Sequence, residues 1–187
     1  MVQSGMATVA EIRLPDWLAG WELPPAPVSD ADAMLLAITL ARENVAHGTG
    51  GPFGAVVRAD STGEIVSVGV NLVPLTGNPV LHAETVAISL AADRLAAGGG
   101  LTLFTSCEPC IMCLGALHWS GIRCIVSAAL QADAEAVGFS EGAGTRELRA
   151  EMAARGVVFL DGLLREEGAD VLRAYVASGQ AIYGPGR

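Results

Sequence analysis

Apolar and polar residues follow two different periods along the first third of this chain. Residues 29–48 carry apolar side chains at helical spacing behind a serine with an aspartate three positions later, which predicts a capped helix. The segments FGAVVRAD (53–60) and EIVSVGVN (64–71) are rich in β-branched residues and flank a Ser-Thr-Gly turn at 61–63. They predict two strands joined as a β-hairpin.

The rest of the chain alternates predicted helices with predicted strands. A helix is expected from about His82 to Ala97, where three glycines stop it, and another from Pro109 to about Ser120. This alternation, with the hairpin at its start, predicts an α/β fold: a three-layer α/β/α sandwich with a mixed five-stranded sheet. The remaining predictions are strands at 101–106, 123–128 and 157–160, a helical pair between the last two, and a final helix that ends near Ala177.

The domain organisation follows from composition and length. Residues 1–28 are rich in proline and are predicted to form an extended arm, with Trp17 and Trp21 packed against the domain. Residues 29–187 are predicted to form one domain that includes the C-terminal helix and tail, since 187 residues suffice for one core.

Hydropathy and charge exclude several classes of partner. The chain is 51% hydrophobic, but its longest clean apolar run, 34–41, is far shorter than the roughly 18 residues of a membrane span. Apolar surface of this amount in a short chain predicts a homodimer. A net charge of -9 argues against nucleic-acid binding. The N-terminal residues resemble no signal peptide, so a cytoplasmic location with reduced cysteines is expected.

Three of the four cysteines lie close together in TSCEPCIMCLG (105–115). Cys110 and Cys113 are predicted to lie one turn apart at a helix N-terminus, which lowers thiol pKa and favours the metal-binding thiolate. This pair alone is equally typical of a redox site. Cys107 lies before Pro109 and off the helix, so it is predicted to be a buried thiol that binds no metal, and Cys124, within a strand, is predicted to be core.

The segment HAE (82–84) favours a metal over a redox pair. His82 with Cys110 and Cys113 gives three ligands, and tetrahedral zinc with three protein ligands keeps its fourth position for water, as in catalytic sites. Glu84 is then the predicted base for that water. His82 and Glu84 can face one site only at the first turn of a helix, which is where they are expected.

The pattern H-x-E…P-C-x-x-C marks zinc-dependent base deaminases, in which the glutamate moves protons and is not a ligand. Four segments resemble the bacterial guanine deaminases of the cytidine deaminase superfamily: GGPFGAVV (50–57), GVN (69–71), TSCEPCIMCLGALHW (105–119) and DAEAVGF (133–139). The resemblance covers roughly residues 31–183. It implies a cytidine deaminase-like fold, a Zn²⁺ cofactor, and a homodimer with an exchanged C-terminal segment. By motif it also implies contacts with the base from Phe53, Asn71, Ala83, Trp119 and Tyr183, and a second catalytic carboxylate at Glu141.

Each of these residues also has a plainer interpretation. Phe53 and Trp119 could be core aromatics, Asn71 a turn residue, and Glu141 a solvated loop charge. The chain also departs from the family, because Pro79-Val80-Leu81 replaces the usual Pro-Thr before HAE. The family aspartate after Gly-Phe is Ser140 here, followed by Glu141.

The leading hypothesis is zinc-dependent hydrolytic deamination of an aminopurine, with guanine converted to xanthine and ammonia. Glu84 would pass the proton of water to the ring nitrogen beside C2. The alternatives are guanosine or an aminotriazine analogue as substrate, or editing of tRNA adenosine, which needs a basic face. A zinc-stabilised interaction domain without turnover is a further alternative, against which Glu84 beside an open coordination position argues.

Overall fold

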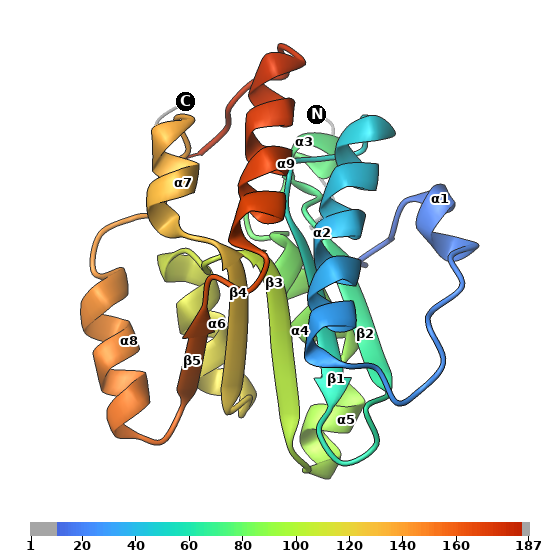
Figure 1. The fold of residues 1–187 in the computed structure, drawn as a ribbon, viewed down its shortest axis with the longest axis vertical. Helices are drawn as coiled ribbons and strands as arrows, with labels where there is room; N and C mark the ends of the chain where they lie inside the picture. Colours follow the sequence, from blue (N-terminus) through green and yellow to red (C-terminus); the bar gives the residue numbers. More distant parts are fainter. Residues whose placement is uncertain (1–10, 185–187) are drawn as a thin grey trace, which may run out of the picture.

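The computed structural model describes residues 11–184, which are arranged in three layers around one sheet (Figure 1). Helices α2 (Asp30–Ala46) and α9 (Arg165–Ala177) cover one face, and α4 (Ala83–Leu90) and α6 (Ile111–Ser120) cover the other. The remaining helices are α1 (Asp16–Ala19), α3 (Val73–Thr76), α5 (Ala92–Ala97), α7 (Gln131–Ala136) and α8 (Thr145–Ala154). The predicted α/β/α sandwich is confirmed.

The sheet has five strands in the order β2-β1-β3-β4-β5. Strands β1 and β2 form the predicted antiparallel hairpin, β1 also pairs antiparallel with β3, and β3, β4 and β5 run parallel. The sheet is therefore mixed, as the sequence predicts. The strands are β1 (Gly54–Ala59), β2 (Ile65–Val70), β3 (Leu101–Cys107), β4 (Cys124–Ala129) and β5 (Val158–Asp161).

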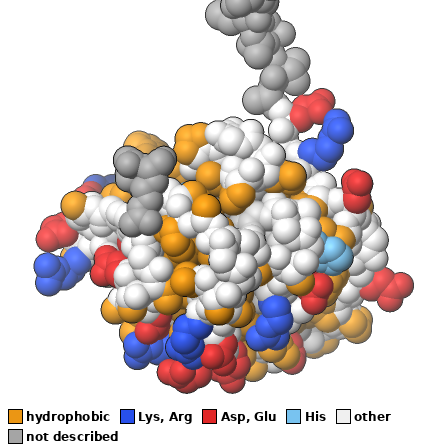
Figure 2. Space-filling model, turned by 90° about the horizontal axis from the view of Figure 1, so that it is seen from above, with side chains coloured by type: hydrophobic (Ala, Val, Ile, Leu, Met, Phe, Trp, Pro, Cys, Tyr) orange, Lys and Arg blue, Asp and Glu red, His pale blue; other side chains and the backbone are white. Residues whose placement is uncertain are grey.

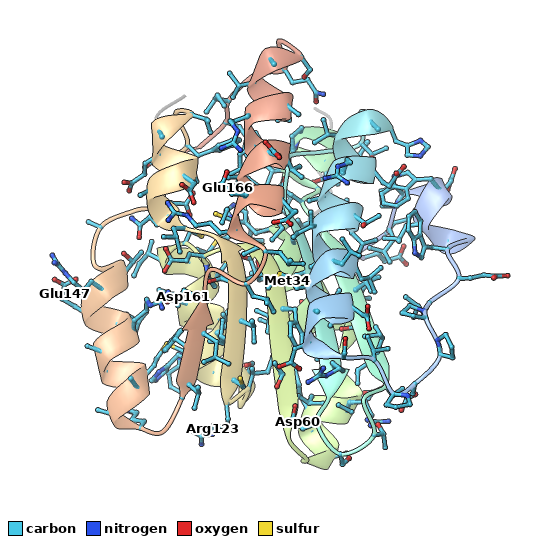
Figure 3. All side chains as sticks on the ribbon, viewed as in Figure 1. Met34, Asp60, Arg123, Glu147, Asp161 and Glu166 are labelled. Atoms are coloured by element: carbon cyan, nitrogen blue, oxygen red, sulfur yellow. The ribbon has the colours of Figure 1, made fainter. Side chains whose placement is uncertain are left out.

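The core has two main parts, one on each face of the sheet, and a third cluster of buried residues around the carboxyl ends of β3 and β4. Successive side chains of a strand point to opposite faces, so Val56 packs under α2 while Ala55 and Val57 pack with α4 and α6. Met34 of α2 is fully buried between that helix and the sheet (Figure 3). All of β3 is buried because both of its faces are covered. Its carboxyl end at Cys107 leads directly into the segment that carries the clustered cysteines.

Two predicted helices differ from the structure. The helix predicted over 82–97 is broken at Ala91, which leaves the helical geometry with φ -88° and ψ 2° and bonds back to Ala87 and Ile88. No glycine or proline marks this break in the sequence. The helix predicted from Pro109 begins at Ile111, and Cys110 is its N-cap in extended conformation. The capping serine of α2 is confirmed, because Ser29 Oγ accepts a 3.1 Å hydrogen bond from the Asp32 amide.

The N-terminal arm packs on the domain through its tryptophans. Trp17 Nε1 donates a 2.9 Å hydrogen bond to Thr49 Oγ1, and its ring stacks on His47 with centroids 5.2 Å apart. Trp21 meets Trp17 edge to face. Residues 1–10 of the predicted arm and 185–187 of the tail lie outside the described residues. Within residues 11–184, no helix combines the length and apolarity that a membrane crossing requires.

Candidate active site

The N-termini of two helices bring three metal-ligating side chains together. His82 is the N-cap of α4, Cys110 is the N-cap of α6, and Cys113 follows in the first turn of α6. The Nδ1 atom of His82 lies 3.5 Å from Sγ of Cys110 and 3.6 Å from Sγ of Cys113. The predicted ligands therefore converge, although they lie 28 to 31 positions apart in the sequence.

These distances fit one tetrahedral zinc ion. Zn–S bonds of about 2.3 Å and Zn–N bonds of about 2.0–2.1 Å place sulfur and nitrogen ligands roughly 3.5–3.6 Å apart at tetrahedral angles. The three ligand atoms, all within 4.8 Å of one another, form one face of such a tetrahedron. The donor set of one imidazole and two thiols is also the kind that zinc prefers. The site suits zinc with one position left for a non-protein ligand.

The electrostatics of the cysteines favour a thiolate at this position. A hydrogen bond from the Cys113 thiol, together with His82, lowers the pKa of Cys110 to about 4, even though burial opposes ionisation. The same hydrogen bond and burial raise the pKa of Cys113, because one proton is shared between the two sulfurs. A thiolate and a thiol this close together form a site to which a metal cation binds favourably.

Glu84 lies beside the ligands but is held by other contacts. Its side chain is only 5% exposed, Thr105 Oγ1 donates to its Oε1 at 3.2 Å, and Sγ of Cys113 lies 3.4 Å from its Oε2. Burial, and then the negative charge of Cys110, raise the pKa of Glu84. Thr105 thus fixes one oxygen and turns the other toward the ligand cluster, the geometry expected of a proton carrier.

A cavity of about 420 Å³ opens over the cluster, within the range of about 300–1,000 Å³ usual for small-molecule sites. His82, Cys110 and Glu84 contribute to its wall. The lining combines apolar side chains with a few polar groups, as in small-molecule sites generally. Further lining residues are Phe53, Glu108, Phe139, Glu141, Gly142 and Tyr183.

Glu141 faces the same cavity from the segment that follows α7. Its side chain is 7% exposed, and its backbone carbonyl accepts a 3.0 Å hydrogen bond from the Ile111 amide at the start of α6. Burial, the Cys110 thiolate and Glu84 raise the pKa of Glu141 to about 8. Gly142 has φ +81°, and a Cβ atom there would lie 2.5 Å from Cγ2 of Ile111, so glycine is required for this close packing. Glu141 is therefore a buried carboxyl of the cavity wall, and not a solvated loop charge.

Aromatic side chains form another wall of the cavity. Phe139 meets the rings of Phe53 and Tyr183 edge to face, with centroids 5.0 and 5.5 Å away. The tail that carries Tyr183 returns to its own chain, since Tyr175 Oη donates a 2.8 Å hydrogen bond to the Ala181 carbonyl. Tyr183 thus lines the cavity of the chain to which it belongs.

Asn71 lies behind this wall with one unsatisfied group. Its Oδ1 accepts a 3.1 Å hydrogen bond from the Val73 amide, while its buried Nδ2 has no hydrogen-bond partner among the described residues. The Tyr183 hydroxyl is also buried, and it lies close enough to the Asn71 side chain for the amide to lower the pKa of Tyr183 against the larger effect of burial. Because buried polar groups are rarely left unpaired, these two groups can bond to each other or to a polar ligand.

Three predicted substrate contacts are not on the cavity wall: Asn71, which lies behind it, Trp119 and Ala83. Trp119 is 86% exposed, so the prediction that it lines the cavity is wrong for this chain's own cavity. At about 1.5 Å per residue, α6 carries Trp119 about 14 Å along its axis away from Cys110. Ala83 is fully buried, and its side chain packs in the core behind the cavity. Any contact of Ala83 with a ligand would therefore come from its backbone.

Glu108 and Phe139 contribute to the wall without having been singled out as site residues. Glu108 lies inside the cysteine motif, and its carboxylate is neutralised by Arg149 at 2.6 Å and by the Gln131 amide. The sequence places Glu108 next to the ligands, but its partner Arg149 comes from α8, 41 positions away. Cys107 is buried with its thiol 3.8 Å from the Leu130 carbonyl and lies outside the ligand cluster, as predicted. Cys124 begins β4 and is half-buried.

Comparisons with known proteins agree with this geometry. The family described as "Cytidine and deoxycytidylate deaminase zinc-binding region" matches residues 27–129. The guanine deaminase of Bacillus subtilis is 40% identical over 132 residues, which is 70% of this chain and 83% of that protein. A solved guanine deaminase from Nitrosomonas europaea is 35% identical, with a TM-score of 0.84 over 92% of this chain and 99% of that chain. A structure in complex with 8-azaguanine is 36% identical, with a TM-score of 0.85 over 93% of this chain and 99% of that chain. The match over residues 27–129, which include all three ligands and Glu84, shows that this chain belongs to the cytidine and deoxycytidylate deaminase family.

Proposed function

We propose that this protein is a zinc-dependent aminohydrolase that converts guanine and water into xanthine and ammonia. The observation that carries this proposal is the presence of two buried carboxyls, Glu84 and Glu141, in one cavity beside a three-ligand site. The similarity to guanine deaminases over most of the chain supports guanine as the substrate. So does a complex of a similar protein with 8-azaguanine, a purine analogue.

His82, Cys110 and Cys113 would hold the zinc ion. Zinc bound there would make a water nucleophilic near neutral pH by lowering its pKa. Oε2 of Glu84 would accept a proton from the attacking water, while Thr105 keeps Oε1 in place. The carboxyl then gives this proton to the ring nitrogen next to C2 of guanine as the C2–O bond forms.

Glu141 serves the amino group that leaves. Guanine presents N–H donors on the side of C2. The departing amine also needs a proton, and Glu84 has already given its proton to the ring nitrogen. A second carboxyl can accept the N–H groups and supply that proton. Tyr183 and the free amide nitrogen of Asn71 add polar contacts, while Phe53 and Phe139 pack against the faces and edges of the base. As the C2 hydroxyl becomes the carbonyl of xanthine, its proton returns to the Glu141 carboxylate, so that water and guanine yield xanthine and ammonia with no further reactant.

The charge distribution favours a free base over tRNA as the substrate. Apart from three histidines, every basic side chain is an arginine, and most of the arginines in residues 11–184 already form ion pairs with carboxylates. On the face seen in Figure 2, basic and acidic side chains are interspersed, without a basic patch to hold a nucleic-acid backbone. Guanosine and aminotriazine analogues stay as alternative substrates of the same site.

Assembly and location form a separate part of the proposal. Trp119, at 86% exposure, and the large apolar content of the chain support a homodimer in which α6 contributes to the contact. Exchange of the tail between subunits is not needed to complete the cavity, since Tyr183 already lines the cavity of its own chain. The four free cysteines agree with a reducing, cytoplasmic location.

A substrate screen tests the proposed reaction. Purified protein is incubated separately with guanine, guanosine, adenine, cytosine and cytidine, and both ammonia release and the ultraviolet spectrum are followed. We expect ammonia and xanthine from guanine with the highest kcat/KM of the set. Turnover of cytosine or adenine above guanine, or no turnover of any of the five, would contradict the assignment.

A further inference from the structure

We propose that Asn44 is a positioning residue for the base-binding side of the cavity. We also infer that its orientation is set by a hydrogen-bond relay that starts at Trp17 in the N-terminal arm. The inference rests on the proposed function for its kinetic part, because it concerns how the Asn71 side is presented to guanine. The relay itself is a structural feature of α2, the turn before β1 and the end of β2.

Asn44 joins the two backbone segments that form this side of the cavity. It is fully buried in α2, and its Nδ2 donates to the carbonyls of Gly51 at 2.9 Å and of Asn71 at 2.8 Å. The two segments also bond to each other, as the Asn71 amide donates to the Phe53 carbonyl at 3.1 Å. The side-chain amide of Asn44 therefore links the backbone of Asn71 to the turn at Gly51.

The turn at Gly50 and Gly51 also contacts Tyr183. A Cβ atom on Gly51 would lie 1.7 Å from the Tyr183 hydroxyl oxygen, so this hydroxyl packs directly on the Gly51 backbone. A Cβ atom on Gly50 would lie 1.8 Å from the Asn71 carbonyl and 2.6 Å from Nδ2 of Asn44. Gly51 lets the Tyr183 side chain, and Gly50 lets the Asn44 amide, approach the backbone closely. Movement of the turn would therefore displace both Tyr183 and Asn71.

The orientation of the Asn44 side-chain amide is set by residues that lie outside the cavity. The indole N–H of Trp17 can only donate, and it donates to Thr49 Oγ1 at 2.9 Å. The Thr49 hydroxyl in turn donates to Asn44 Oδ1 at 2.8 Å. With Oδ1 occupied, Nδ2 must face the two carbonyls, which can only accept. All hydrogen bonds of the relay therefore run in one direction. They start at the indole N–H, which can only donate, and end at backbone carbonyls, which can only accept, and each bond strengthens the next.

Trp17 is itself held firmly, because its ring stacks on His47 at an interplanar angle of 6° and meets Trp21 at 5.7 Å. The arm therefore contributes more than apolar packing. Removing the Thr49 hydroxyl would leave the Asn44 oxygen and the Trp17 N–H without their partners, and would allow the amide to turn. We expect the backbone of Gly51 and Asn71 to loosen as a result, with weaker binding of the base and unchanged chemistry at Glu84.

Two threonine-to-valine variants separate the relay from general stability. Thr49→Val breaks the relay without changing side-chain shape. Thr102→Val, the matched control, removes a 2.6 Å hydrogen bond to Asp60 at the opposite end of β3 (Asp60 is labelled in Figure 3). Thr49→Ser restores the hydroxyl, and Trp17→Phe removes the donor while keeping an aromatic ring. If Thr49→Val fails to fold, the comparison of Trp17→Phe with Thr102→Val replaces it.

The first measurement is hydrogen–deuterium exchange of peptides that cover 50–54 and 70–73, which needs no substrate. We expect faster exchange of the Phe53 and Asn71 amides in Thr49→Val and Trp17→Phe, and wild-type exchange there in Thr102→Val and Thr49→Ser. The second is steady-state kinetics on guanine with zinc content checked. KM should rise about fivefold or more in Thr49→Val, the scale of one net hydrogen bond, with kcat within about twofold of wild type. The double variant Trp17→Phe/Thr49→Val should be no worse than Thr49→Val, because both changes break one relay.

The outcomes distinguish this inference from the proposed reaction. A wild-type protein that leaves guanine unchanged refutes the reaction, while the exchange data still decide whether the relay holds the site. Wild-type exchange and KM in Thr49→Val overturn the relay even if guanine is the substrate. Equal effects of Thr49→Val and Thr102→Val at 50–54 also overturn it, because the change would then reflect loss of overall stability.

Discussion

Glu84 and Glu141 lie in the wall of one cavity, and both carboxyls are almost completely buried. They come from different elements, since Glu84 is in the first turn of α4 and Glu141 follows α7. Burial raises the pKa of both carboxyls, and the charge of Glu84 raises that of Glu141 further, because like charges in one poorly solvated space repel. Pairs of carboxyls with raised pKa values are typical of sites that move protons.

The first prediction concerns the metal site. Purified wild-type protein should contain about one zinc ion per chain by elemental analysis, since the cluster supplies three ligands for a single ion. Cys110→Ala and Cys113→Ala should lose both zinc and turnover. Cys107→Ala is the matched control, because this buried thiol lies outside the cluster and zinc should be retained. Zinc at the wild-type level in Cys113→Ala would show that the ligand set is wrong.

Glu84 is predicted to act on protons without holding the metal. Glu84→Gln keeps the size of the side chain and the hydrogen bond from Thr105 but cannot accept a proton from water. We expect zinc content and thermal unfolding near wild type, with turnover of guanine at or below the detection limit. An active Glu84→Gln enzyme with its zinc in place would eliminate the proposed proton path.

Glu141 is predicted to be the second acid–base group. Glu141→Gln should retain zinc and fold, since the Ile111 amide binds the backbone carbonyl and not the side chain. Turnover of guanine should fall about a hundredfold or more, the usual scale for losing a positioned acid–base group. Steady-state kinetics with zinc content measured in parallel decide the matter. If the variant works within a few-fold of wild type, Glu141 only shapes the wall, and guanine loses its strongest local support.

Tyr183 packs on Gly51, and this contact gives a prediction that tests the role of the tail separately from the rest of the cavity wall. Gly51→Ala would place a methyl group 1.7 Å from the Tyr183 hydroxyl oxygen, so the tail that carries Tyr183 must move away. KM for guanine should rise several-fold while zinc content stays constant. In a Tyr183→Ala background the same Gly51→Ala change should have little further effect, since the clash is already gone. Gly20→Ala, where an added methyl meets only open space, is the control. Additive effects of the two changes would argue that the tail does not sit on this turn in solution.

Assembly is tested by light scattering. The expected mass is twice the 19.1 kDa of one chain. Trp119→Arg should shift the protein toward the monomer, because it places a charge on a large exposed apolar side chain. Leu35→Arg makes the same kind of change at an exposed apolar residue of α2, on the other face of the sheet, and should leave the mass unchanged. A fully active wild-type monomer would refute the dimer.

The chain's local chemistry was readable from the sequence. Cys110 and Cys113 lie about one helical turn apart, so they can face one point, and His82 and Glu84 can do so because a helix is predicted to begin at His82. The five strands were also readable, because the β-branched runs and their turns are local signals. What spacing could not show is that both helix N-termini meet, since 28 positions separate His82 from Cys110 and only the sheet order brings them together.

The tertiary structure decided the features that depend on direction and distance. Trp119 shares a motif with the ligands, yet the rise of α6 carries it away from them to the surface. Arg149 reaches Glu108 from α8, and Tyr183 returns to Gly51 from the far end of the chain. The contact between Asn44 and Asn71 is of the same kind: neither residue has a neighbour in the sequence that indicates the other. Local patterns determine which residues are chemically able to form the site, and packing of the helices on the sheet determines which of them meet.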